Sequence, residues 1–593
     1  NDPYRGGTHL NDVTLIVPLF DEAGNLIVFP AVRAHWVDVG GMVPGSYSGR
    51  ATNVYQEGLR IPIIKIAEKG RINKAALDLM LANMRLPQER LGDFNASLGA
   101  CKIAESRIRT LVARYGWATV KGAVALHLDR TERRLRERIA ALPDGTYCYE
   151  DYLEFYDDGR LDPVLARVAL TVAGDQITAD FAGSNPQVPG VVNSSLAVAG
   201  AGVFVAIKST LDPGGAVNDG AFRPITLKAP EASIFDVRLD APAGAHGEVR
   251  KRALSVTLGA LAQIMPELVS GDLCGSSFPN AMGGWNARRK RPYVYFEFPA
   301  GGNGGFAEAD GSSAFVNVDF GNLPSIQNAE VLENEMPVLV ERCALHVDGG
   351  GEGARRGGSG LERAIRLLDA EATYSCLSDR AVIPPFGILG GGSGAPYEVA
   401  IRRGRRVIAF DTPGKVTGHP VQRDDVLLIR SSGGGGYGDP LARDPALVAA
   451  DVARGTVSRA RARDGYGVAL NRDGSVDEGK TRTLRRQLDK ARCRVAVRAD
   501  DRIDPYVGKR GRRRVLDLAP ALAKALKLRD GDLLEILGRH PAPLRAWARI
   551  TPEAKAQAIA LDAFGRRVLG VESGDRVVLR RVATPDLPLG MAG

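Results

Sequence analysis

Two histidines and one aspartate near the start of the chain have a spacing that suits a metal site. His9 stands three residues before Asp12, and His35 follows in the segment 34–41. Two imidazoles and one carboxylate can bind Mn²⁺, Fe²⁺ or Zn²⁺ and leave coordination positions open. A histidine beside a strand is also often a hydrogen-bonded core residue, and the residues alone leave that alternative open.

A β-hairpin is the element that must bring these residues together. Residues 12–29 contain two β-rich runs separated by turn-forming residues. If the turn closes a regular hairpin, Asp12 faces Ala34, the neighbour of His35, and facing Cβ atoms are about 5 Å apart. Because His9 and Asp12 would point to opposite faces of a regular strand, the glycine turn before His9 must rotate it inward.

Five further residues are candidates for roles around a metal. Asp38 and Glu57 could orient a ligand or act as a catalytic base, and the alternative for each is a solvated or capping role. Arg223 could bind a phosphate or carboxylate bidentately, unless it forms a surface salt bridge. The backbone N–H groups of Gly434 and Gly435 could form an anion nest for a phosphorylated intermediate. Alternatively, these glycines supply positive φ in tight turns.

Six segments spread along the sequence carry recognisable motifs. They are residues 1–14, 34–46, 55–62, 218–225, 355–360 and 433–440. Together these motifs resemble the hydantoinase B/oxoprolinase family, and the resemblance covers residues 1–485 in order. Members usually carry a further segment before the Asn-Asp-Pro motif that begins at Asn1. An N-terminal part of the core, with any site residues it holds, is therefore expected to be missing.

The resemblance implies a metal-dependent B subunit of an ATP-dependent cyclic amide hydrolase, of hydantoinase, oxoprolinase or lactamase type. The expected partner is a hydantoinase A-type ATPase subunit, which binds ATP and phosphorylates a small-molecule substrate, so a hetero-oligomer is expected. In the related ketone carboxylases, the metal lies on a His-x-x-Asp motif and a second histidine, which match His9, Asp12 and His35. A carboxylase subunit is therefore an alternative. A non-catalytic scaffold subunit is another, and it would tolerate the loss of both histidines.

Length and composition define the broad class of protein. The chain has 593 residues and a mass of 63.2 kDa, which is too long for one hydrophobic core. No uninterrupted apolar run is long enough for a membrane-spanning helix. The net charge of +9 is modest and aromatic residues make up only 6%, so a nucleic-acid partner is not expected. The six cysteines include no Cys-x-x-Cys pair, which favours a reducing compartment such as the cytoplasm.

The sequence predicts a multi-domain α+β protein with mainly antiparallel sheets. Its expected parts are a metal-site hairpin region (1–71), a helical insertion (72–146), a glycine-rich α+β core (147–440), a helical arm (441–490) and a small β-barrel extension (491–593). In the extension, Gly531-Asp532 recurs as Gly574-Asp575 with an offset of 43 residues. Two copies of one strand–helix–turn–strand unit predict a pseudo-symmetric β-barrel of the double-psi kind.

Overall fold

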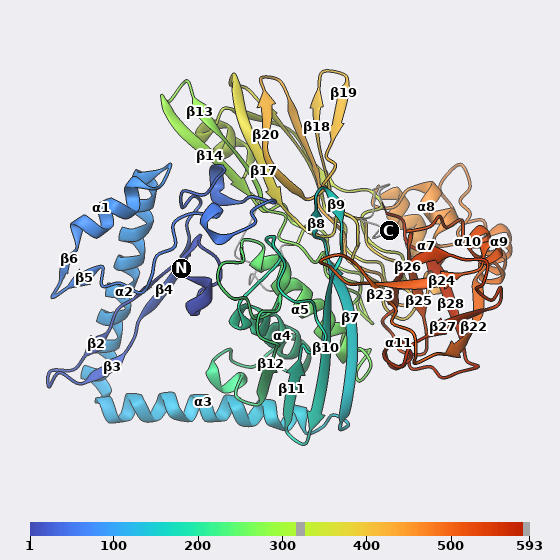
Figure 1. Ribbon diagram of the computed structural model, residues 1–593, viewed down its shortest axis with the longest axis horizontal. Coiled ribbons are helices and arrows are strands. Elements are labelled where there is room, and N and C mark those ends of the chain that lie inside the picture. The colour runs from blue at the N-terminus through green and yellow to red at the C-terminus, as the bar shows by residue number, and fades with distance from the viewer. Residues whose placement is uncertain (316–325, 585–593) are drawn as a thin grey trace.

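The computed structural model describes residues 1–315 and 326–584 of the chain. Figure 1 shows the N-terminal hairpin region on one side of a β-rich centre and the C-terminal extension on the other side. Within these two described ranges, no helix is both long enough and apolar enough to span a bilayer.

The predicted N-terminal hairpin is present, with a register one residue away from the expected one. Its strands are β1 (Asp12–Ile16), β2 (Leu19–Phe20), β3 (Leu26–Val28) and β4 (Ala31–His35). β1 and β4 are antiparallel and pair Asp12 directly with His35, where Ala34 was expected. The difference arises near the turn, where the pairing is irregular between Leu19 and Phe20.

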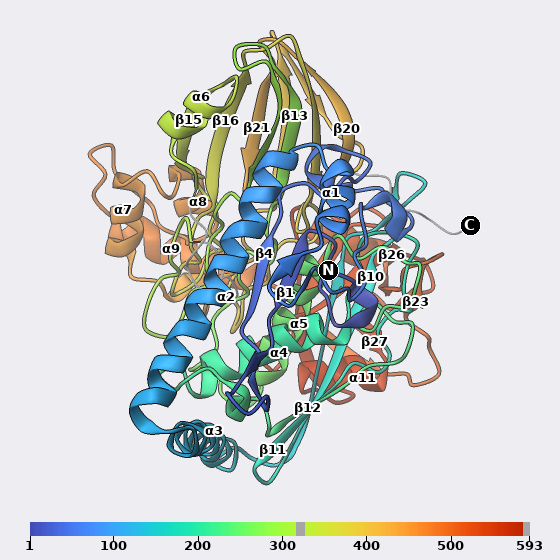
Figure 2. The same cartoon turned by 90° about the vertical axis from the view of Figure 1, so that its left-hand side faces the viewer.

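Three helices occupy the segment in which helices were expected. The short strands β5 (Ala67–Glu68) and β6 (Arg71–Ile72) precede α1 (Lys74–Ala82), α2 (Pro87–Tyr115) and α3 (Trp117–Ile139). Gly116 separates α2 from α3 with a φ of +78°, which favours glycine. Figure 2 shows α2 running along β1 and β4, which it contacts. Phe94 of α2 and Trp36, which follows β4, share one buried apolar cluster, so α2 fixes the position of the hairpin.

A four-stranded sheet and two helices form the centre of the molecule. The elements are β7 (Gly145–Leu153), β8 (Tyr156–Asp157), β9 (Arg160–Leu161), β10 (Val164–Ala173), β11 (Gln176–Asp180), α4 (Leu196–Leu211), β12 (Ile225–Lys228) and α5 (His246–Leu261). The sheet has the order β12-β11-β10-β7, and α5 packs on both α4 and β7. Gly259 permits this close approach, because a Cβ there would lie 2.3 Å from the ring of Tyr149. The sheet therefore fixes the position of α5.

Two antiparallel sheets lie beside this centre and share a second apolar core (Figure 1). The four-stranded sheet has the order β14-β13-β17-β20, and the five-stranded sheet has the order β15-β16-β21-β18-β19. The elements are β13 (Asn280–Asn286), β14 (Arg291–Glu297), α6 (Ala329–Glu335), β15 (Val338–Leu345), β16 (Leu361–Leu367), β17 (Glu371–Leu377), β18 (Glu398–Arg403), β19 (Arg406–Ala409), β20 (Lys415–Gln422) and β21 (Val426–Arg430). The mainly antiparallel α+β architecture expected from the sequence is thus present.

The glycine runs between these strands pack backbone against backbone. The N–H of Gly434 donates to the carbonyl of Gly358 at 3.0 Å, and the N–H of Gly435 donates to the carbonyl of Asp272 at 2.8 Å. A Cβ at Gly434 would lie 2.1 Å from the carbonyl oxygen of Asn303, so close approach requires the glycine. The prediction of an anion nest at Gly434 and Gly435 is therefore wrong, because both N–H groups are already bonded. Neither residue has the positive φ of the alternative prediction.

The helical arm and the C-terminal extension follow the glycine runs. Their elements are α7 (Pro445–Ala453), α8 (Arg459–Asp464), α9 (Glu478–Lys490), β22 (Cys493–Ala499), β23 (Tyr506–Val507), β24 (Arg513–Leu518), α10 (Pro520–Leu526), β25 (Leu533–Leu537), β26 (Leu544–Ile550), β27 (Ala558–Leu561), α11 (Ala563–Leu569) and β28 (Arg576–Arg581). The predicted strand–helix–turn–strand unit occurs twice, as β24-α10-β25 and β27-α11-β28. β26 pairs in parallel with β24, and β22 pairs in parallel with β27, so each half of the sheet contributes a strand to the other.

Buried ion pairs connect the C-terminal extension to the centre. Asp151 of β7 is completely buried and forms ion pairs with Arg252 of α5, with Arg380 at 3.0 Å and with Arg545 of β26 at 3.2 Å. Burial disfavours the charge of Asp151, but the three guanidinium groups outweigh burial and hold its pKa well below the usual range. The two parts also share one continuous hydrophobic core. The extension is therefore an integral part of the folded molecule.

Candidate metal centre

The structure brings His9, Asp12 and His35 together. Asp12 begins β1 and His35 ends β4, and the two residues are direct cross-strand partners. His9 follows a turn in which Gly6 has a φ of +88°. His9 Nε2 lies 3.3 Å and His35 Nδ1 lies 3.2 Å from Asp12 Oδ1. One potential ligand atom from each residue lies within 4.8 Å of the others, which is compatible with one shared cation.

The protonation states of this cluster suit metal binding. Burial raises the pKa of Asp12, but the charge of His9 and hydrogen bonds from His35 and His9 outweigh it and hold the pKa well below its usual range. Burial lowers the pKa of His35, although the hydrogen bond to Asp12 opposes the shift. Metal ligands must be ionised carboxylates and neutral imidazoles, and these shifts favour both forms.

Unsatisfied polar atoms test whether the cluster fits a metal. Nε2 of His9 and Nε2 of His35 are both buried and lack a hydrogen-bond partner. The contact between His9 Nε2 and Asp12 is within ion-pair distance but is not a hydrogen bond. Buried polar atoms normally have partners, and a divalent cation would supply one. The residues therefore fit the metal that their sequence pattern predicts.

Aromatic rings surround the cluster on one side. Tyr47 packs edge-on against His9 with ring centroids 5.6 Å apart, and Phe296 of β14 stacks on His35 at 5.4 Å. Phe298 contacts Phe296, so the two phenylalanines extend the apolar wall. Such a wall limits the access of water and offers an apolar surface to a small ring. The sequence analysis did not identify these three residues, because nothing local indicates that this end of β14 meets the hairpin.

A third histidine joins the cluster from a distant part of the chain. His246 is the first residue of α5, and its ring centroid lies 4.1 Å from that of His9. His246 Nε2 lies 3.9 Å from Asp12 Oδ2. The sequence predicted a helix over residues 247–265, but no motif there marked its histidine as a functional residue.

Glu57 supports the backbone that leads to α5. Its buried carboxylate accepts hydrogen bonds from the N–H groups of Ala243 at 3.0 Å and Gly244 at 2.6 Å. Burial raises the pKa of Glu57 to about 7, although these two hydrogen bonds oppose the shift. Its hydrogen bonds therefore assign Glu57 to positioning this segment, and the proposed role as a catalytic base has no direct support from these contacts.

The raised pKa of Glu57 predicts a pH-dependent stability. A group whose pKa is raised by folding stabilises the fold while it is protonated, below its unfolded value of 4.5, and this contribution is lost as the pH rises through about 7. We expect the wild type to lose at most about 3 kcal/mol over this range relative to Glu57→Gln, from about 1.4 kcal/mol per pH unit. Thermal unfolding of both proteins between pH 4 and pH 8 measures the difference. A difference that does not change with pH would contradict this assignment.

Asp38 has a structural environment. Its fully buried carboxylate accepts hydrogen bonds from the N–H groups of Gly40 at 3.0 Å and Gly45 at 2.9 Å, and it forms an ion pair with Arg85 at 2.9 Å. These contacts order the loop after β4 and attach it to the segment between α1 and α2. The capping alternative of the sequence analysis describes these contacts better than the role of a base.

Arg223 lies outside the cluster. Its guanidinium group forms ion pairs with Asp219 at 2.9 Å, Glu132 at 3.1 Å and Asp129 at 3.3 Å. Asp129 and Glu132 belong to α3, on the surface of the molecule. The surface salt-bridge alternative is therefore correct, and the structure does not place Arg223 at the candidate site.

A short segment of the arm has the spacing of a phosphate-binding loop, Gly-x-x-x-x-Gly-Lys-Thr, at residues 474–481. The expectation that ATP binds elsewhere did not take this match into account. In the structure, Asp477 caps α9 by accepting a hydrogen bond from the N–H of Lys480 at 3.0 Å, and it also pairs with the Lys480 side chain at 2.8 Å. A carboxylate thus occupies the place where a phosphate would bind, so these contacts describe a capped helix.

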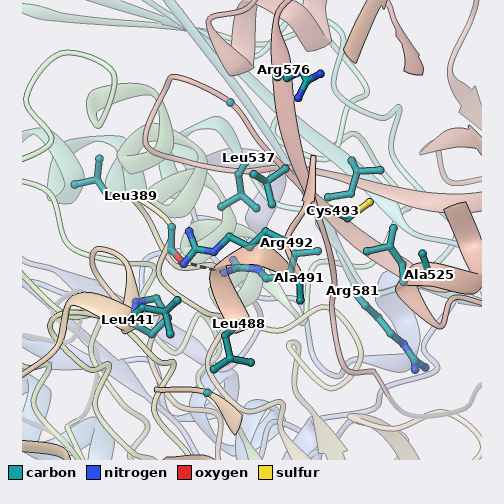
Figure 3. A pocket seen from close by; sticks show the side chains of 18 of the residues that line it. Leu389, Leu441, Leu488, Ala491, Arg492, Cys493, Ala525, Leu537, Arg576 and Arg581 are labelled. Carbon is teal, nitrogen blue, oxygen red and sulfur yellow. Dashed lines mark hydrogen bonds between the residues drawn. The ribbon is translucent and has the colours of Figure 1, made fainter. Parts of the chain in front are cut away.

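A cavity of about 710 Å³ lies where the arm, the C-terminal extension and the turn at Leu389 meet. Figure 3 shows leucine side chains and Arg492 lining it, with Arg576 and Arg581 further out. None of its lining residues belongs to the histidine cluster. The candidate metal centre is therefore recognised by its side-chain chemistry and not by this cavity.

Comparison with known proteins gives the chain its family. The crystal structure of ATP-dependent caprolactamase from Pseudomonas jessenii is 30% identical, covers 82% of this chain and 84% of that chain, and has a TM-score of 0.76. The B subunit of a putative D-/L-hydantoinase from Pseudomonas sp. is 29% identical and covers 82% of this chain and 83% of its own length. The structure of acetone carboxylase, at 22% identity and a TM-score of 0.75, shares the fold; it covers 83% of this chain and 71% of that chain. A model of the hydantoinase B/oxoprolinase family matches residues 1–440, and the chain belongs to this family.

Proposed function

We propose that this chain is the metal-dependent B subunit of an ATP-dependent enzyme that opens a cyclic amide. The observation that carries the proposal is the buried set of His9, Asp12 and His35, whose protonation states and unpartnered atoms suit a divalent cation. Relatives named as a hydantoinase subunit and a caprolactamase support the substrate class. They also support a multi-subunit enzyme, because each name refers to one subunit.

The residues of the cluster define what this chain contributes. His9, Asp12 and His35 would hold Mn²⁺, Fe²⁺ or Zn²⁺, and the bound ion would supply Lewis acidity for attack on a carbonyl carbon. Tyr47 and Phe296 shield one side of the cluster from bulk water. Asp12 remains ionised in this buried environment, so it can hold the two imidazoles in position.

ATP is assigned to a partner subunit of the hydantoinase A type. Resonance makes an unactivated amide a poor electrophile, and phosphorylation of its carbonyl oxygen would produce an activated imidate. Ring opening by water would then follow on this chain, with cleavage of the carbon–nitrogen bond. The capped helix at residues 474–481 supports this division of labour, because its N-terminus is already occupied by Asp477.

The purified complex with its ATPase partner tests the substrate class. We expect hydantoin, 5-oxoproline or caprolactam to stimulate ATP hydrolysis and to yield the ring-opened product in proportion to the phosphate released. Acetone or acetophenone with ¹⁴C-bicarbonate is the matched alternative. Incorporation of ¹⁴C into product without any cyclic amide turnover would replace the hydrolase proposal with the carboxylase one.

A further inference from the structure

We infer that His246 is a fourth protein ligand of the metal centre, an inference that rests on the function proposed above. Its ring lies against that of His9, with centroids 4.1 Å apart, and its Nε2 faces Asp12 Oδ2 at 3.9 Å. His246 is almost completely buried, with 11% of its side chain exposed. It comes from α5, so the centre would join the hairpin to the central helix.

The contact with Asp12 is not explained as a hydrogen bond. A separation of 3.9 Å exceeds the hydrogen-bond range of about 2.7–3.2 Å. Asp12 Oδ2 already accepts a hydrogen bond from the hydroxyl of Thr8. Nδ1 of His246 is buried without a partner as well. Both nitrogens of this buried ring therefore lack a hydrogen bond, and a shared cation would give Nε2 a partner.

The backbone around His246 is held in place independently of the cluster. The N–H of Ala245 donates to the carbonyl of Val191 at 3.0 Å, and the N–H of His246 donates to the carbonyl of Ala243 at 3.0 Å. Glu57 accepts hydrogen bonds from Ala243 and Gly244 immediately before it. This support is the arrangement expected of a preorganised ligand, whose position does not depend on the metal.

A fourth ligand narrows the choice of metal. Zinc held by four protein ligands is tetrahedral and closed, as in structural sites. A centre that binds His9, Asp12, His35 and His246 and still admits a substrate needs five or six coordination positions. Among the three candidate ions, this requirement favours Mn²⁺ or Fe²⁺ over Zn²⁺.

Metal binding by the full-length chain tests this inference without measuring activity. The probe is Mn²⁺ alone, with free Mn²⁺ followed by electron paramagnetic resonance and imidazole ligands counted by X-ray absorption at the Mn edge. We expect three imidazoles in the wild type, two in His246→Ala and His246→Gln, and a dissociation constant raised at least about tenfold in both variants. The control is His346→Ala, which removes another buried histidine whose Nδ1 lacks a partner.

The outcomes separate this inference from the proposed function. Two imidazoles in the wild type, or an affinity of both His246 variants within twofold of the His346→Ala control, would overturn the assignment of His246 and leave the three-residue centre intact. A wild type that binds no Mn²⁺, Fe²⁺ or Zn²⁺ would instead overturn the metal centre as a whole. The wild-type ligand count needs no variant, so it decides the question even if a substitution unfolds the chain.

Discussion

Replacement of His9 or His35 by alanine is expected to remove the bound metal and to reduce ATP-dependent ring opening by about three orders of magnitude or more. The magnitude follows because Lewis-acid stabilisation of a transition state amounts to several kcal/mol, and about 4 kcal/mol corresponds to a thousandfold. Each variant also leaves Asp12 with one fewer imidazole neighbour at about 3.2–3.3 Å. Metal content by mass spectrometry and turnover by the reconstituted complex measure the two effects.

The matched control for these variants is Arg223→Ala. Arg223 is one of the residues that the sequence indicated for substrate binding, but the structure places it on the surface among three carboxylates. It should retain both the metal and the activity. If His9→Ala and His35→Ala keep wild-type turnover, the scaffold alternative is correct and the chemistry belongs to the partner.

Replacement of Asp151 by asparagine is expected to destabilise the folded chain by about 3–5 kcal/mol. Asparagine preserves the volume of the side chain but removes the charge that faces Arg252, Arg380 and Arg545 in a fully buried environment. Breaking a buried ion pair from one side costs this much because it leaves an uncompensated charge away from water. Since a domain is typically stable by only about 5–15 kcal/mol, the variant should unfold at a much lower urea concentration.

The contrast with a surface pair makes this prediction specific. Asp517 and Arg549 form an ion pair in which both side chains are about half exposed. Asp517→Asn should change the stability by less than about 1 kcal/mol. Equal midpoints of urea unfolding for Asp151→Asn and Asp517→Asn would show that the buried network is not what connects the extension to the centre. Because unfolding of a chain of this length involves more than two states, the first cooperative transition is the one to compare.

The Asp151 network also bears on the part of the chain beyond the family match. The match ends at residue 440, whereas Arg545 and Arg514 of the extension pair with Asp151 and Glu150 of β7. The extension therefore completes the charge balance of the centre. Its removal would leave two buried carboxylates with fewer partners, so this family member depends on a segment that the family motifs do not include.

The sequence by itself determined the local parts of this protein. His9, Asp12 and His35 lie within one hairpin, and short-range strand pairing brings such residues together without help from the rest of the chain. The helices between residues 72 and 142 follow from their side-chain periodicity, and the two units of the extension follow from the Gly-Asp echo. Even here, one irregular pair in the turn shifted the register by a residue.

Only the tertiary structure decided which distant segments meet the hairpin. His246 and Phe296 reach the cluster because α5 packs on β7 and because β14 ends beside the hairpin, and no spacing in the sequence encodes either contact. Arg223 and Gly434 had suitable chemistry, but their neighbours use it for ion pairs and backbone hydrogen bonds. The chemical type of a residue is local, whereas its availability depends on every group that folding places around it.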